Sequence, residues 1–132
     1  MILAIRSDKP EAELYLLDNN KVVKELKWPA HRELADTLIG NITKLAESAG
    51  IKLRSIDGII IHTGEGSFTG LRIGTTVANA LAYGLTIPIV AAESDSWIER
   101  GLKDLAQREV GEYVIPKYSS EPNITESKKA SA

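Results

Sequence analysis

A glycine-rich run between an apolar stretch and a long helical pattern constrains the fold more than any other feature. The run Gly64-Glu-Gly-Ser-Phe-Thr-Gly-Leu-Arg-Ile-Gly74 follows the apolar residues 58–62 and opens a helix predicted over residues 69–85. Its glycines permit positive φ and the close approach of another backbone or a ligand. Ser67 and Thr69 can cap the helix, and such a helix start can also hold an anion. The pattern alone predicts a strand, a tight turn and a helix.

Length and charge limit what this chain can do alone. Its 132 residues are enough for one buried core, and we expect a single domain at residues 1–116 and a flexible polar tail at residues 117–132. The net charge of −2 gives no electrostatic reason for the isolated chain to bind nucleic acid or anionic lipid. Cysteine, a membrane-length apolar run and a signal-like start are all absent, so we expect a cytoplasmic protein.

Hydrophobic periodicity predicts three strands followed by alternating helices and strands. Residues 2–5, 12–18 and 22–27 have strand patterns, and the Asn pair before the third predicts a hairpin turn. Pro29 stops the third strand. This order predicts an α/β fold with a mixed sheet covered by helices. The later predicted elements are helix 30–49, strand 58–62, helix 69–85, strand 87–91, helix 94–108 and a short strand 112–115.

The residues from Gly66 to Gly74 resemble the signature of the bacterial TsaB family, also called YeaZ. Nine consecutive residues, Gly-Ser-Phe-Thr-Gly-Leu-Arg-Ile-Gly, match in the expected strand-to-helix setting, whereas Glu65 departs from the family's usual Gly-Pro-Gly. The similarity extends from Met1 to Val90. The residues that this resemblance assigns to the signature loop are Gly64, Gly66, Ser67, Phe68, Thr69, Gly70 and Arg72.

The resemblance implies both a fold and a role. TsaB-like proteins have the ribonuclease H-like half-domain, with a five-stranded mixed sheet, that actin, sugar kinases and Hsp70 also use. They are partner subunits of the machinery that makes threonylcarbamoyladenosine in tRNA. We therefore expect a non-catalytic scaffold that dimerises with a TsaD-like catalytic subunit. A TsaE-like ATPase would join the same complex, and tRNA would be contacted only through it.

Two further expectations follow from the same resemblance. The resemblance is also compatible with a homodimer and with a nucleotide bound at the shared interface. The family also continues past its third helix into a second, smaller lobe, whereas this chain goes almost directly to residues 114–118, Val-Ile-Pro-Lys-Tyr. The second lobe therefore looks largely deleted.

The helix predicted over residues 69–85 has one bulky row and two rows of small residues. Small residues let a neighbouring helix approach closely, and a helical glycine costs about 1 kcal/mol relative to Ala, so Gly74 indicates tight packing. The helix predicted over residues 30–49 can fill part of this surface, and a second chain is the alternative for the rest. One small row is Gly70, Gly74, Ala78 and Ala82, and the other is Thr76, Ala80 and Gly84. By resemblance, the predicted partner interface is Leu38, Ile42, Leu45, Gly70, Gly74, Ala78 and Ala82.

The sequence offers no catalytic or metal-binding arrangement. Kinases of this fold hold magnesium near a carboxylate after the first strand, but the matching residue here is Arg6, which has donors only. We expect Asp8 to be a solvated turn residue. His62, at a strand end, is a satisfied histidine or a ligand contact. With two histidines and no cysteine, we expect no metal, no cofactor and no catalysis by this chain. The alternative is a minimal ATP-binding phosphotransferase or ATPase of the actin-like superfamily.

Overall fold

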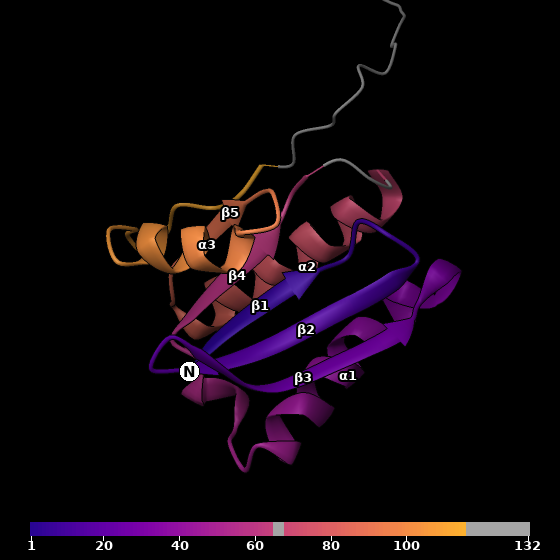
Figure 1. The fold of residues 1–132 in the computed structure, drawn as a ribbon, viewed down its shortest axis with the longest axis horizontal. Helices are drawn as coiled ribbons and strands as arrows, with labels where there is room; N and C mark the ends of the chain where they lie inside the picture. Colours follow the sequence, from indigo (N-terminus) through magenta and orange to yellow (C-terminus); the bar gives the residue numbers. More distant parts are fainter. Residues whose placement is uncertain (65–67, 116–132) are drawn as a thin grey trace, which may run out of the picture.

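Five strands form one mixed sheet, and helices lie against both of its faces (Figure 1). The computed structural model describes residues 1–64 and 68–115, so the predicted tail at 117–132 lies outside the described residues. The strands lie in the order β3-β2-β1-β4-β5. Their bounds are β1 Ile2–Arg6, β2 Glu11–Asp18, β3 Lys21–Pro29, β4 Gly58–His62 and β5 Ile89–Ala92.

The helices form the two outer layers. α1 and α2 lie behind the sheet in Figure 1, and α3 lies in front of it. β1 pairs antiparallel with β2 and β2 with β3, whereas β1, β4 and β5 run parallel. This is the α/β, ribonuclease H-like arrangement that the sequence predicts. The helix bounds are α1 Leu34–Ser48, α2 Phe68–Leu85 and α3 Trp97–Leu105, with 3-10 turns η1 His31–Glu33 and η2 Leu53–Ser55.

Alternation along the central strands supplies apolar side chains to both helix layers. Successive strand residues point to opposite faces, so Leu3 and Ile5 of β1 pack in the cluster with α1 and α2. Ala4 and Ile60 pack instead in the cluster beneath α3, with Trp97. Each fully buried aliphatic side chain stabilises the fold by roughly 1.5–3 kcal/mol, which makes these central strands the main source of stability.

Local backbone geometry explains where the elements begin and end. Asn19 and Asn20 have φ of 52° and 65°, which confirms the predicted hairpin turn. α1 begins at Leu34 rather than at residue 30, because His31 has a φ of 46°, which an α-helix excludes. α3 begins at Trp97 rather than at residue 94, and Ser94 has a φ of 78°.

Residues 112–115, here called the strap, are irregular, so the predicted last strand is wrong. A side chain supplies the backbone hydrogen bonds of Val114 that pairing with a neighbouring strand would otherwise have made. Asn79 of α2 donates from Nδ2 to the Val114 carbonyl at 2.8 Å, and the Val114 N–H donates to Asn79 Oδ1 at 3.0 Å. Arg108 Nε donates to the Ile89 carbonyl at 3.0 Å, on the outer edge of β5. The strap is therefore held by α2 and does not pair with β5.

α2 comes unusually close to the sheet at Gly74. A Cβ built on Gly74 would lie 2.0 Å from Ser7 Oγ and 3.0 Å from Ser7 Cβ. That hydroxyl donates to the Gly70 carbonyl at 2.8 Å. The close packing that the sequence indicated at Gly74 is therefore explained by a residue of the same chain, just after β1.

Removing the Asn79 side chain should loosen the strap and destabilise the domain. Asn79→Ala leaves both backbone groups of Val114 without partners, and a buried polar group left unpaired costs about 1–3 kcal/mol. Denaturant unfolding and hydrogen exchange at the Val114 amide measure the two effects. The matched control is Asn41→Ala at a half-buried position of α1. Equal effects at the two sites would contradict the role of Asn79.

Gly74→Ala should destabilise the wild-type protein and do so much less when Ser7 is alanine. The added methyl group displaces the Ser7 hydroxyl from its bond to Gly70, and Ser7→Ala removes that hydroxyl. We expect a coupling of at least about 1 kcal/mol in a double-mutant cycle of unfolding free energies. The control is Gly84→Ala in the same helix, where a Cβ meets nothing within 4 Å. That control should be neutral or stabilising by up to about 1 kcal/mol.

Candidate functional site

The residues predicted to form the partner interface lie mostly inside the chain. α1 packs against α2, and their facing side chains close over the sheet. Gly70 is half-buried, and the others are buried: Leu38, Ile42, Leu45, Gly74, Ala78 and Ala82. Contact between these residues and a partner remains a prediction. Their burial means that such a contact has to begin at the side chains on the outer surface of the same two helices.

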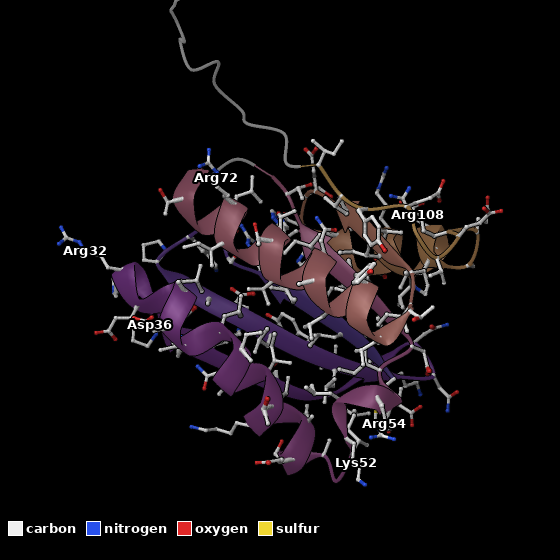
Figure 2. All side chains as sticks on the ribbon, turned by 180° about the vertical axis from the view of Figure 1, so that it is seen from behind. Arg32, Asp36, Lys52, Arg54, Arg72 and Arg108 are labelled. Atoms are coloured by element: carbon white, nitrogen blue, oxygen red, sulfur yellow. The ribbon has the colours of Figure 1, made fainter. Side chains whose placement is uncertain are left out.

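The outer surface of the α1–α2 layer carries small and apolar residues beside charged ones, among them Asp36, which Figure 2 labels on α1. Ile39 is 48% exposed, although it is a large aliphatic side chain in the middle of α1. The second small row predicted on α2 points outward. We call this surface the outer helical face, and its residues are Ala35, Ile39, Gly40, Thr76, Ala80 and Gly84, all of them exposed.

Two glycines of this face have no role in packing within the described residues. A Cβ added to Gly40 of α1 or to Gly84 of α2 would meet no described atom within 4 Å, and neither glycine has positive φ. Glycine inside a helix costs about 1 kcal/mol relative to Ala. No described contact compensates for that cost. Close approach of another protein surface to the two glycines would explain it.

Charged residues lie at the ends of this layer. Figure 2 shows Arg32 and Arg72 at the end where both helices begin, and Lys52 and Arg54 toward the opposite end. A cleft of about 410 Å³ opens where the two helices begin, between them and the end of β1. Its lining residues are Ser7, Lys9, Pro10, Ala30, His31, Arg32, Leu34, Thr69, Gly70 and Ile73. Exposed Asp36 and Lys44 lie one helical turn to either side of Gly40, so charged residues border this face along α1 as well as at its ends.

The structure describes the two ends of the signature loop. Gly64 follows β4, and its N–H donates to His62 Nδ1 at 3.2 Å. Thr69 lies inside the first turn of α2 and is exposed, so it does not precede the helix as a cap. Arg72 is exposed one turn further on. Gly66 and Ser67 lie outside the described residues, and of Phe68 only the backbone is described.

Asp8 is buried, so the expectation of a solvated turn residue is wrong. It is 2% exposed, and its Oδ1 accepts a hydrogen bond from Arg6 Nε at 2.9 Å. Arg6 reverses the charge expected at the end of β1, and Asp8 balances it from two residues away. The carboxylate is therefore already paired with a cation within the chain.

His62 lies beside this ion pair and is 4% exposed. Its Nδ1 is 3.6 Å from Asp8 Oδ2, and its ring packs edge-on to Trp97 with centroids 5.3 Å apart. Burial lowers the pKa of His62 from its ordinary value, and the raising effect of Asp8 offsets this only partly. Burial therefore favours the neutral form of His62, and its Nδ1 has a partner within the chain in the Gly64 N–H.

A second polar group extends the cluster along β2. Glu13 accepts a hydrogen bond from Tyr15 Oη at 2.6 Å and forms an ion pair with Lys9. Burial alone would raise the pKa of Glu13, but the bonds from Lys9 and Tyr15 outweigh it and lower that pKa. The sequence analysis missed this group. The signal was the period-two pattern of β2, which places Glu13 and Tyr15 on one face.

The arrangement of these groups does not resemble a metal site. Within residues 1–64 and 68–115, no three His, Asp or Glu side chains converge to hold an ion. In the same part of the chain, no helix is long and apolar enough to cross a membrane.

Comparison with known proteins identifies relatives of this chain. Residues 28–121 match the family model described as "TsaD: tRNA N6-adenosine threonylcarbamoyltransferase". The tRNA threonylcarbamoyladenosine biosynthesis protein TsaB of Bacillus subtilis is 30% identical over 93 residues, which is 70% of this chain and 41% of that protein. The TsaB protein of Haemophilus influenzae is 28% identical over 80 residues, 61% of this chain and 34% of that protein.

A solved structure agrees with these matches. YeaZ from Pseudomonas aeruginosa superposes with a TM-score of 0.65 at 28% identity, over 70% of this chain and 43% of that one. The chain thus spans less than half the length of these relatives. The solved structure therefore shares the fold described above over that part of the chain. The chain belongs to the family that the TsaD model describes, and within it to the TsaB (YeaZ) proteins.

Proposed function

We propose that this chain is a non-catalytic partner subunit in the synthesis of threonylcarbamoyladenosine in tRNA. It pairs with a TsaD-like catalytic subunit, and a TsaE-like ATPase acts in the same complex. The chain does not need to bind tRNA itself, which agrees with its net charge of −2. The relatives named TsaB and the family model named for the transferase support the pathway.

The outer helical face is the observation that carries the proposed pairing. Its exposed Ile39 and its small residues on α2 offer a shallow apolar surface to two helices of a partner. Gly40 and Gly84 would let backbones approach closely. The predicted interface residues beneath, such as Leu38 and Ala78, then support this face from the core.

The polar residues Arg6, Asp8 and His62 already have partners within the chain, which favours a scaffold over an enzyme. Arg6 and Asp8 bond to each other, so the end of β1 offers no uncompensated carboxylate for a magnesium–nucleotide complex. His62 is buried against Trp97 and does not face the cleft between α1 and α2. The geometry of the described residues does not favour the ATP-binding phosphotransferase alternative, although the matched family model is named for a transferase. A homodimer through the outer helical face remains the alternative to a heterodimer.

A charge placed at Ala80 should abolish the complex and leave the fold intact. Ala80 is exposed at the middle of the outer helical face, so Ala80→Arg places no charge in the core. A partner covering that face would have to bury an unpaired guanidinium, and we expect at least about a 100-fold loss of affinity. The measurement is titration with the TsaD-like protein of the same genome, together with tRNA modification by the reconstituted subunits.

Ala106→Arg is the matched control, because Ala106 is exposed at the end of α3 on the opposite side of the sheet. It should bind the partner like wild type, and both variants should unfold at similar temperatures. Equal binding by Ala80→Arg and wild type would exclude the outer helical face. A wild-type chain that binds itself but no TsaD-like protein would favour the homodimer. Binding of neither would refute the proposed function.

A further inference from the structure

His62 Nδ1 faces two groups that cannot both be satisfied by one protonation state. The Gly64 N–H points at this atom from 3.2 Å, and the carboxylate of Asp8 lies 3.6 Å from it. Nδ1 accepts from an N–H only when it carries no proton. It attracts the carboxylate only when it carries one.

We propose that His62 is a proton-operated latch on Gly64. When the imidazole is neutral, Nδ1 accepts the hydrogen bond of the Gly64 N–H and fixes the chain directly after β4. When Nδ1 binds a proton, it donates to Asp8 and releases the Gly64 N–H. Gly64 opens the glycine run, so acid loosens the connection at the end of β4. The latch lies within this chain and does not depend on the proposed partner.

The surroundings of the ring favour an exchange of bonds over a rotation of the side chain. Trp97 of α3 packs edge-on against the imidazole, with an interplanar angle of 86°. A Cβ on Gly64 would lie 2.7 Å from His62 Cε1, so the ring and this glycine are also in close contact. The ring cannot turn without displacing one of these neighbours, so a proton changes the bond that Nδ1 makes.

The charges around the ring set the direction of the response. Asp8 and Arg6 act on it from the end of β1, Glu13 from β2, and Glu93 from the segment after β5, while Trp97 of α3 is uncharged. Burial is the largest influence and lowers the pKa of His62 below its ordinary 6.5. The unfolded chain therefore takes up this proton first. The stabilising effect of neutral His62 is complete above pH 6.5 and is lost as the pH falls through the lowered value.

The test is an NMR titration of the isolated full chain, following the His62 ring and the Gly64 amide together. His31 is exposed and serves as the reference histidine. We expect the Gly64 amide shift to change with the same midpoint as the His62 ring, and its exchange protection to fall at least about tenfold across that transition. The ring nitrogen shifts should show an unprotonated Nδ1 at neutral pH.

Two variants separate the latch from a general response to acid. In His62→Asn the side-chain oxygen can replace Nδ1 as an acceptor that does not titrate, so Gly64 protection should stay constant over the same pH range. In Asp8→Asn the stabilising anion is lost, and the His62 midpoint should fall by at least about half a pH unit. A Gly64 amide that ignores the His62 transition overturns the proposal. So does a neutral ring that is protonated at Nδ1. These two observations need only the wild-type chain.

Discussion

The contact between Ser7 and the first turns of α2 determines how the rest of the molecule is arranged. One hydroxyl bonds the Gly70 carbonyl and fills the space where a side chain at Gly74 would lie. α2 is therefore drawn onto the sheet by its small row, and Ala78 and Ala82 follow into the core. The other small row consequently turns outward beside α1. The same anchor fixes the end of β1, from which Arg6 and Asp8 reach each other.

Most of the fold could be predicted from the sequence because its signals are local. The Asn pair specifies a hairpin, and the apolar runs specify buried strands whose order allows few topologies. The choice between two small rows on α2 could not be predicted, because both have the same spacing and both consist of small residues. The contact that Ser7, far away in sequence, makes with Gly70 and Gly74 belongs to the row that faces inward. The strap has a strand-like sequence, but the amide of Asn79 takes its hydrogen bonds.

The candidate site was harder to predict because its polar groups act in pairs across strands. Taken one at a time, Asp8 has the sequence signature of a turn and His62 that of a strand end. Their burial becomes understandable only when β1 and β4 are neighbours and Arg6 supplies the balancing charge. An arginine at the end of β1 would be costly in this position by itself, because an unpaired charge is poorly solvated there. The substitution and its compensation have to be considered together.

The Arg108 bond to β5 has a consequence for how this protein avoids aggregation. An open sheet exposes backbone groups along its two outermost strands, and those groups can recruit further strands without limit. Here the guanidinium of Arg108 donates a hydrogen bond to the Ile89 carbonyl of β5, at one border of the sheet. The long strand on the other border carries Lys21, Lys24 and Lys27, whose like charges repel an identical strand laid alongside. Growth of the sheet by addition of further strands is therefore discouraged at both borders.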